Sequence, residues 1–269
     1  MPLDCEPERR FALTRGARDY RLKPVHSFWE DRFFMSAPQS AQGYVCERKF
    51  SGEVTALDRV IAVVGAACAP DDKFAEGVVN SIYFDTPSLL SYSEKANGDN
   101  LKTKLRVRWY GRDDALPKEV PVFVELKRRI GGARDKERIE TTAPRDLLLD
   151  APFEGSELRD FIMSALKDID IPSPLSWFPS VLISYSRLRY YDHPSQSRVS
   201  IDWDIRAPRF NGHLFPTGHP IHLDSMVCEY KNDLGAPPPW AEEMRRCGLR
   251  FGSFSKFGEC VSRLASFEQ

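Results

Sequence analysis

The sequence predicts an α+β fold in which antiparallel strands curl into a barrel tunnel with helices packed outside it. Three observations lead to this prediction. Eight or so segments have strand character, and most of them follow one another directly along the chain. Several strands alternate basic with apolar residues, the pattern of a sheet with one polar and one buried face. The chain has 269 residues, of which 42% are hydrophobic and 29% charged, which is typical of a globular domain.

Composition also excludes several classes of protein. The formal net charge is -1, so the overall charge indicates neither a nucleic-acid nor an acidic-membrane partner. The longest nearly apolar run, Val60 to Ala69, is about half of the roughly 20 residues that a membrane-spanning helix needs. The first thirty residues lack the apolar segment of a secretory signal. Six scattered cysteines without a C-x-x-C pair predict reduced thiols. We therefore expect a cytoplasmic protein without Cys-bound zinc.

Two regions follow from the distribution of turn residues and apolar residues. Residues 1–43 are charged and interrupted by prolines, and they carry one aromatic patch, so we expect an N-terminal extension that docks on the barrel. Residues 44–269 would form the barrel domain. Its first strand is expected at Tyr44 to Phe50. Ser51 is then expected to cap a helix, because apolar residues from Val54 to Val64 follow at helical spacing.

Turn signals divide the rest of the domain into further elements. Examples are Asp85-Thr-Pro87, Gly111-Arg-Asp-Asp114 and Gly131-Gly132, each of which follows or precedes a β-rich run. The strands expected between such signals are Gly77 to Phe84, Leu101 to Tyr110, Val120 to Arg129, Asp135 to Thr141, Ser180 to Tyr191, Arg198 to Asp204 and Met226 to Lys231. Apolar residues at helical spacing predict helices over Leu147 to Lys167, with a break at Gly155, and over Trp240 to Cys247 and Ser255 to Leu264.

Basic residues gather on one face of these strands. In the run from 104 to 109, Lys104, Arg106 and Arg108 share one face, because side chains in a strand alternate with period two. The same spacing relates Glu125 to Lys127, Lys136 to Arg138, Tyr185 to Arg187 and Arg189, Glu229 to Lys231, and Glu47 to Lys49. For a single strand this could be a solvated outer face. Six mainly basic strands in a chain of net charge -1 instead favour an inward basic lining. The outward apolar residues would be Leu105, Val107, Trp109, Val124, Leu126 and Val227.

An enclosed basic lining indicates a ligand of opposite charge. Concentrated cations in an enclosed site cost desolvation free energy unless an anion fills the site. Arginine binds phosphate oxygens through two parallel hydrogen bonds, and lysine acts as a point charge. The predicted ligand is therefore a linear polyanion such as a phosphate chain. RNA or DNA is disfavoured, because the aromatic residues are not interleaved with the basic faces as stacking platforms would be.

Ten short motifs follow one another between residues 44 and 264. They are Glu47-x-Lys49, Tyr83-Phe-Asp85-Thr, Tyr92-x-x-Lys95, Lys104-x-Arg106-x-Arg108-Trp-Tyr-Gly111, Val124-Glu-Leu-Lys127, Lys136-x-Arg138, Tyr185-x-Arg187, Ser200-Ile-Asp202, Glu229-x-Lys231 and Phe254-Ser-Lys256-Phe. Each motif alone is weak, but the ordered series resembles the VTC domain. That domain is the polyphosphate polymerase branch of the triphosphate tunnel metalloenzyme, or CYTH-like, superfamily.

The resemblance implies an antiparallel tunnel that binds ATP, tripolyphosphate or inorganic polyphosphate together with Mn²⁺ or Mg²⁺. It implies an ATP-dependent transferase that moves the γ-phosphate to a growing polyphosphate chain. The implied catalytic residues are Lys49, Arg106, Arg108, Lys127, Arg187 and Lys256. The implied phosphate-binding residues are Lys95, Lys104, Lys136, Arg138, Tyr185, Arg189, Lys231 and Ser255. The implied metal ligand is Glu229, with Glu47 and Glu125 as further candidates, although each glutamate could instead pair with a neighbouring base.

One departure from the superfamily pattern bears on the reaction. Hydrolytic relatives begin with Glu-x-Glu-x-Lys, whereas this chain has Val45-Cys-Glu47-Arg-Lys49. One carboxylate fewer weakens support for a metal-activated water, which favours transfer over hydrolysis. The alternatives are a tripolyphosphate or nucleoside-triphosphate hydrolase and a non-catalytic polyphosphate-binding module. His213, His219 and His222 lie in a Gly/Pro-rich connection and are a poor metal signal. The oligomeric state and a separate membrane partner are left open.

Overall fold

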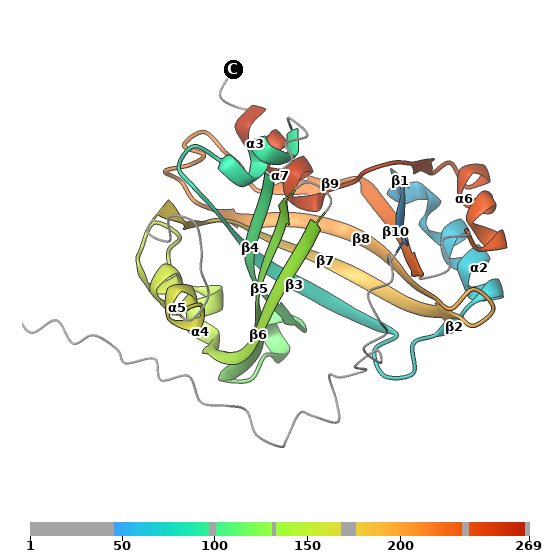
Figure 1. Cartoon of the computed structure of the whole chain (residues 1–269), viewed down its shortest axis with the longest axis horizontal. Coiled ribbons are helices and arrows are strands. Elements are labelled where there is room, and N and C mark those ends of the chain that lie inside the picture. Colours follow the sequence, from blue (N-terminus) through green and yellow to red (C-terminus); the bar gives the residue numbers. More distant parts are fainter. Residues whose placement is uncertain (1–45, 97–100, 131–132, 168–175, 233–236, 267–269) are drawn as a thin grey trace, which may run out of the picture.

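A computed structural model of the chain describes residues 46–96, 101–130, 133–167, 176–232 and 237–266 (Figure 1). The expected N-terminal extension over residues 1–43, with its docking on the barrel, lies outside these residues. Val45 also lies outside them. None of the described helices is both long enough and apolar enough to cross a membrane.

The described residues form strands joined by short helices. The strands are β1 (Cys46–Glu53), β2 (Ala69–Pro70), β3 (Glu76–Asp85), β4 (Leu101–Tyr110), β5 (Glu119–Ile130), β6 (Ala133–Pro144), β7 (Phe178–Asp192), β8 (Ser197–Phe210), β9 (Ile221–Leu223), β10 (Ser225–Asn232) and β11 (Arg250–Phe251). The α-helices are α2 (Leu57–Ala67), α3 (Leu90–Ala96), α4 (Arg145–Leu149), α5 (Glu157–Ala165), α6 (Glu243–Arg246) and α7 (Lys256–Ala265). Turns of 3-10 helix are η1 (Val54–Ala56), η2 (Asp113–Ala115) and η4 (Pro239–Glu242).

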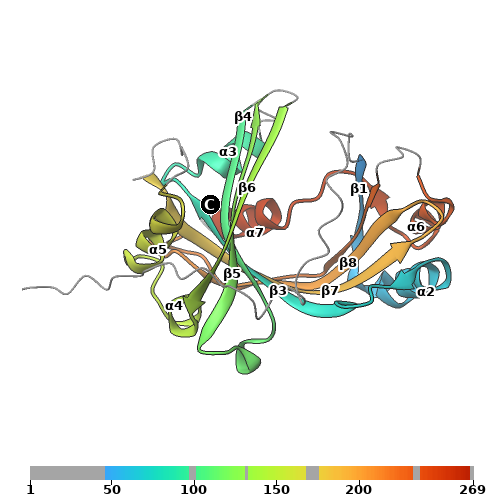
Figure 2. The ribbon, with the colours of Figure 1, turned by 60° about the horizontal axis from the view of Figure 1, so that its bottom comes forward.

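The strands make one curved antiparallel sheet of 11 strands. Its order is β11-β1-β10-β8-β7-β3-β4-β5-β6, with β2 beside β7 and β9 beside β8. Strands β4, β5 and β6 rise at one side of a floor made by β3, β7 and β8, and β1 rises at the other side (Figure 2). Among the described strands β11 and β6 do not pair with each other. The α+β antiparallel fold is confirmed, and its sheet is an open trough rather than a closed barrel.

The apolar face of β4 and β5 is buried under helices, as the alternation predicts. Leu105, Val107 and Trp109 have no exposed surface, and they pack in one cluster with residues of α4 and α5. Among these helix residues are Leu148, Leu158, Phe161 and Ile162. Burial of one such side chain contributes about 1.5–3 kcal/mol to folding. This packing holds the alternate residues of β4 and β5 toward the inside of the trough.

Val227 was predicted to face outward, and that prediction is wrong. Val227 packs with Tyr185 and Phe257 on the concave side of the sheet. The reason is the strand period: Val227 and Glu229 are two residues apart on β10 and therefore share a face. The residues between them and beside them, Met226 and Cys228, face outward in the cluster that includes Val60 and Val64 of α2.

One helix lies inside the trough. Residues Phe257, Cys260, Val261 and Leu264 of α7 pack on the face of the sheet that carries Tyr185. Figure 2 shows α7 between the two rising sides of the sheet. The expectation that all helices pack outside is therefore corrected for α7. The apolar stripe of α7 requires an apolar surface, and the concave sheet face supplies one at this end.

One local boundary differs from the sequence prediction. Ser51 does not cap a helix, because β1 continues to Glu53 in register with β10. The residues from Ser51 to Glu53 pair with β10 instead of starting a helix, and α2 begins only at Leu57. The helical stretch expected over 147–167, with its break at Gly155, is observed as two helices, α4 and α5, on either side of that break. The helix expected from Ser255 is present as α7, and Ser255 caps it, since its Oγ accepts a hydrogen bond from the backbone N–H of Gly258 at 3.1 Å.

Candidate functional site

The trough holds a cavity of about 310 Å³ on its concave face. The lining residues are Glu47, Lys49, Tyr83, Lys104, Arg106, Arg108, Glu125, Lys127, Tyr185, Arg187, Glu229, Lys231, Phe254, Ser255, Lys256 and Phe257. Eight of these residues are lysine or arginine and three are glutamate. Because the whole chain has a net charge of -1, this cavity concentrates positive charge that the rest of the chain balances.

One side of the cavity, the β4–β5 wall, consists of Lys104, Arg106, Arg108, Glu125 and Lys127. Arg106 faces Glu125 across the two strands, and its Nε donates to the Glu125 carboxylate at 2.7 Å. Lys104 faces Lys127 in the same register, so two like charges lie side by side. In the part of the chain that the structure describes, Lys104, Arg108 and Lys127 have no carboxylate within salt-bridge distance. This wall therefore carries an excess of positive charge.

The pKa values of the β4–β5 wall reflect this excess. Burial and the neighbouring Arg106 lower the pKa of Lys127 to about 8. Burial also lowers the pKa of Lys104. Burial alone would raise the pKa of Glu125, but the charges of Arg106, Arg108 and Lys136 outweigh it and hold that pKa well below its usual range. Glu125 is thus an ionised counter-charge, and the two lysines are held in a cationic environment that an anion would relieve.

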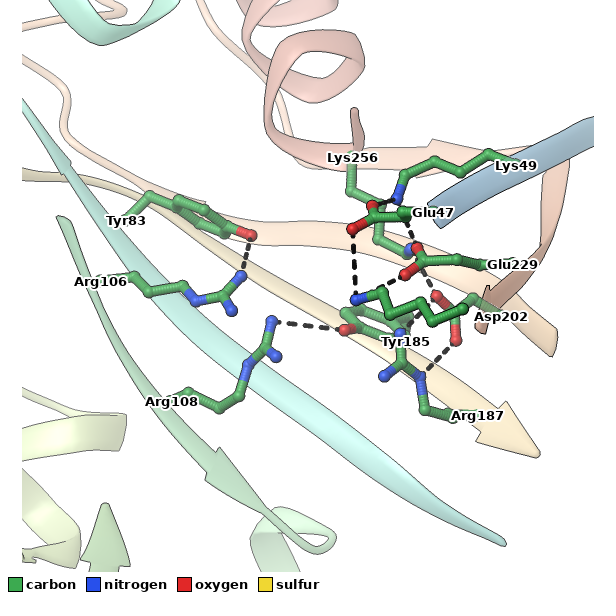
Figure 3. Close-up of polar contacts among 11 residues, drawn as sticks. Glu47, Lys49, Tyr83, Arg106, Arg108, Tyr185, Arg187, Asp202, Glu229 and Lys256 are labelled. Carbon is green, nitrogen blue, oxygen red and sulfur yellow. Dashed lines mark hydrogen bonds and ion pairs between the residues drawn. The ribbon is translucent and has the colours of Figure 1, made fainter. Parts of the chain in front are cut away.

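Hydroxyl groups, not carboxylates, hold Arg108. Its Nε donates to Ser81 Oγ at 3.0 Å. Its guanidinium also donates to the Tyr185 hydroxyl at 3.4 Å (Figure 3). The Tyr83 hydroxyl likewise accepts from Arg106 at 3.1 Å, and the Tyr83 ring stacks on Phe257 of α7 at 4.9 Å. Burial would raise the pKa of Tyr83, but Arg106 and Arg108 outweigh it and lower that pKa to about 8. These hydroxyls orient the two arginines without neutralising them.

The opposite side, the β1–β10 wall, consists of Glu47, Lys49, Glu229 and Lys231. The register places Lys49 opposite Glu229 and Glu47 opposite Lys231, so charges alternate in both directions. Lys49 Nζ contacts Glu47 and lies 2.5 Å from Glu229 (Figure 3). Lys231 Nζ lies 2.9 Å from Glu229 and 3.4 Å from Glu47. Burial would raise the pKa of Glu229, but Lys231 and Lys49 lower it to about 2. Every charge in this wall has a partner of opposite sign.

Between the walls, one carboxylate holds two cations of the cavity. Asp202 of β8 accepts from Arg187 Nε at 2.6 Å and from a second nitrogen of the same guanidinium at 2.8 Å. Its other contact is Lys256 Nζ at 2.5 Å, from the first residue of α7 (Figure 3). Lys256 Nζ also lies over the Tyr185 ring at 4.5 Å. We call Arg187, Asp202 and Lys256 the Asp202 cluster.

The cavity brings together most of the residues expected from the sequence. All six implied catalytic residues and all three candidate metal ligands line it, as do Lys104, Tyr185, Lys231 and Ser255. Lys136 and Arg138 of β6 lie beyond the lining, with their nitrogens 3.3 and 4.0 Å from Glu125. Arg189 also lies outside the lining and donates to the Phe74 carbonyl at 3.1 Å. The backbone of Lys95 belongs to α3, but its side chain lies outside the described part of the structure.

Sequence reasoning did not assign four residues of the site. Tyr83, Phe254 and Phe257 line the cavity, and Asp202 holds two of its cations. Each lies in one of the ten motifs, so the motif series contained the signal. Tyr83, Phe254 and Phe257 are not charged, so the search for basic faces passed over them. Phe254 and Phe257 belong to α7 and the segment before it, whose position inside the trough the sequence did not indicate.

Comparison with known proteins decides the family. The family model of the VTC domain matches residues 70–265. The chain belongs to the VTC domain family. Glu47 and Lys49 precede the matched residues of this VTC domain, although they share the cavity with residues inside the match. No curated protein matches the sequence.

Two solved structures are similar to this VTC domain in fold. One is described as "a putative adenylate cyclase" from Bacillus halodurans, with 14% sequence identity, coverage of 78% of this chain and 92% of that chain, and a TM-score of 0.45. The other, from Vibrio parahaemolyticus, has the same description, with 12% identity, coverage of 83% and 99%, and a TM-score of 0.43.

The superfamily implies a divalent metal, and the carboxylates of the β1–β10 wall fit one. Within the described residues no group of three or more Asp, Glu, His or Cys side chains is arranged to hold a metal ion. Glu47 and Glu229, however, both contact the single cation Lys49 Nζ, so their carboxylates can reach one common position. Mg²⁺ is commonly held by one or two carboxylates, with substrate phosphates and water as its other ligands. The donor set therefore suits a metal that arrives with a phosphate.

Proposed function

We propose that this VTC domain is an ATP-dependent polyphosphate polymerase, in which the γ-phosphate of ATP is transferred to the end of a polyphosphate chain. The observation that carries the proposal is the cavity itself, with eight lysine and arginine residues against three glutamates. Such a lining is stable with a polyanion inside it, because the anion neutralises cations that otherwise repel one another. A phosphate chain carries negative charge on every unit, which matches a lining with an excess of positive charge.

The reaction requires positioning and charge neutralisation rather than a covalent enzyme intermediate. A terminal phosphate oxygen of the chain attacks the γ-phosphorus of ATP and forms the new P–O bond. The bond from the γ-phosphorus to the bridging oxygen breaks, and ADP leaves with the electron pair. In the β4–β5 wall, Arg106 and Arg108 would bind the transferred phosphate through the guanidinium N–H donors that their protein partners leave, and Lys104 and Lys127 would neutralise adjacent units. Electrostatic stabilisation of this kind is the main catalytic contribution in phosphoryl transfer.

The residues of α7 and of the β1–β10 wall would complete the site. Ser255 Oγ accepts from the Gly258 N–H, which leaves its own hydroxyl proton available to a phosphate oxygen. Lys256 and Arg187 would bind a phosphate from their position between the two walls. A divalent ion held by Glu229 and Glu47 would act as a Lewis acid on phosphate oxygens. The lysines that contact these glutamates, Lys49 and Lys231, would then be available to the phosphates.

Position 45 favours transfer over hydrolysis. Hydrolytic relatives carry a glutamate there, two residues before the glutamate that corresponds to Glu47, and this chain carries valine. A carboxylate at that position would add a metal ligand and a partner for an attacking water. We therefore expect water to compete poorly with the phosphate chain as the acceptor.

A gel assay tests the proposal directly. Purified protein is incubated with ATP, Mn²⁺ and a short polyphosphate primer, and the chains, ADP and orthophosphate are measured together. We expect longer chains, with ADP released in step with chain growth and little orthophosphate. Orthophosphate without chains longer than the primer would identify a hydrolase instead. Tripolyphosphate binding without any product would identify a binding module. The Val45→Glu variant should shift the products toward orthophosphate.

A further inference from the structure

Asp202 is buried to a degree that sets it apart from the carboxylates that line the cavity. Its side chain has no exposed surface, whereas the Glu125, Glu229 and Glu47 side chains are 5%, 12% and 36% exposed. Asp202 is absent from the lining, so a ligand in the cavity would not meet it. Burial of an isolated carboxylate costs several kcal/mol, and the two cations of the Asp202 cluster offset that cost.

The contacts of Asp202 determine the orientation of two lining side chains. Arg187 uses one edge of its guanidinium for the two bonds to Asp202, at 2.6 and 2.8 Å. Its remaining N–H donors are left for the cavity that it lines. Lys256 likewise donates to Asp202 through one N–H and keeps its others. The same carboxylate thus connects β7, β8 and the first residue of α7.

We propose that Asp202 is a positioning residue for phosphate binding: without touching the ligand, it holds Arg187 and Lys256 in the orientation that binds the phosphate chain. The proposal rests on the proposed function, since it assigns these two cations to phosphate. The Asp202 cluster carries one negative and two positive charges, so it keeps a net positive charge toward the cavity. Asp202 therefore fixes the geometry of the two cations, but its own negative charge reduces the attraction of the cluster for an anion.

The negative charge of Asp202 makes the positioning role testable. A positioning role and a pure charge role predict opposite changes in polyanion affinity when that charge is removed. If Asp202 acted only through its charge, Asp202→Asn would remove a negative charge near the cavity and tighten the binding of a polyanion. If Asp202 positions Arg187 and Lys256, the same variant releases both side chains from their shared acceptor and weakens binding. Charge-assisted hydrogen bonds are strong enough that the expected loss is about tenfold or more.

The experiment measures tripolyphosphate affinity by calorimetry, without metal, on the full chain. Asp192→Asn is the matched control: Asp192 is also buried and ends β7, but it accepts from Ser195 and Trp240 and does not line the cavity. We expect Asp202→Asn to weaken binding about tenfold or more and Asp192→Asn to leave it unchanged. Unchanged or tighter binding in Asp202→Asn would overturn the proposal, and so would an equal loss in the control.

A second variant covers failure of Asp202→Asn to fold. Asp202→Glu keeps the charge and displaces the carboxylate by one methylene, so a positioning role predicts weaker binding and a pure charge role predicts unchanged binding. In the Lys256→Gln background, Asp202→Asn should cost less than in the wild type, and an undiminished loss would contradict action through Lys256. Wild-type protein that does not bind tripolyphosphate would instead contradict the proposed function, which keeps the two failures distinct.

Discussion

The β4–β5 wall of the cavity carries four cations and the β1–β10 wall carries two, and the two sets differ in how they are paired. In the β1–β10 wall, each lysine contacts two glutamates, and the strand register alternates the signs. In the β4–β5 wall, one glutamate faces Arg106, and the remaining cations are held by hydroxyl groups or lie beside one another. Paired cations have fixed positions and little net charge. Unpaired cations repel one another and attract an anion.

This difference in charge pairing suggests that the two walls have different roles in one site. The β4–β5 wall would supply most of the attraction for phosphate, because its charge is not cancelled locally. The β1–β10 wall would supply carboxylates for a metal and lysines that become available when the metal takes their partners. The Asp202 cluster is intermediate in charge pairing, because two cations share one buried carboxylate. Substitutions in the two walls should therefore have different signatures.

The largest effect is expected from Glu229→Gln in the β1–β10 wall. The substitution keeps the size of the side chain and removes a charge that a divalent metal needs, so the turnover of chain synthesis should fall by about 100-fold or more. Tripolyphosphate binding without metal should be retained or tighter, because Glu47 still contacts both lysines. Glu53→Gln, at the exposed end of β1, is the control and should keep full activity. Full metal-dependent turnover in Glu229→Gln would contradict the metal assignment.

Both walls together should make the fold more stable when a phosphate chain is bound. A ligand that binds the folded state stabilises it by RT ln(1 + [L]/Kd), or about 2.7 kcal/mol at a hundredfold excess over Kd. Thermal unfolding with and without tripolyphosphate measures this, with sulfate at equal ionic strength as the control for screening. A melting temperature that saturating tripolyphosphate does not change would contradict phosphate binding in this cavity.

Arg108→Ala isolates the β4–β5 wall. Arg108 has hydroxyl partners, so its removal leaves no buried carboxylate unpaired, and the effect on binding is easier to interpret than that of Arg106→Ala. We expect tripolyphosphate affinity to fall by about 1.5–3 kcal/mol, the contribution of a charge-assisted contact. The control is Arg112→Ala, because Arg112 follows the end of β4, does not line the cavity and has a side chain that is 76% exposed. Equal affinity in the two variants would show that Arg108 does not bind phosphate.

The smallest expected effect is a pH dependence of binding. The pKa of Lys127 is lowered to about 8, so its charge is lost as the pH rises through that value. Tyr83, with its pKa also lowered to about 8, gains a negative charge over the same range. Both changes disfavour an anion, and tripolyphosphate affinity should fall about three- to tenfold between pH 7 and 9 at low salt.

Two variants separate the contributions to this pH dependence. Lys127→Arg stays protonated throughout and should remove the lysine contribution, and Tyr83→Phe should remove the tyrosine contribution. Ionisation of the ligand itself is the same for all variants, so calorimetric titrations of each variant can be compared directly. A pH profile that neither substitution changes would contradict this interpretation. The stability of the fold responds to pH in the opposite direction from ligand binding. Because the folded state holds the Lys127 proton less tightly than the unfolded chain, this group's contribution to the free energy of unfolding rises with pH from about 8.

The sequence determined the strands and the set of residues that share the basic face. Both follow from a local rule, the period of two, and this rule placed Lys104, Arg106 and Arg108 together inside and their neighbours under α4 and α5. The same period of two also places Val227 on the inner face, because Val227 and Glu229 are two residues apart on β10. The implied catalytic residues all line the cavity because each lies on the polar face of its element.

Only the tertiary structure decided which of these cations are paired. Lys49 and Glu229 are 180 residues apart and meet through the register of β1 and β10, which no local pattern specifies. The pairing of Asp202 with Lys256 depends on α7 lying inside the trough. The open sheet, with β11 and β6 not paired to each other among the described strands, likewise depends on how far the sheet curves. Side-chain direction is a local property of the backbone, whereas charge pairing depends on contacts between distant segments, and it therefore appears only once the chain has folded.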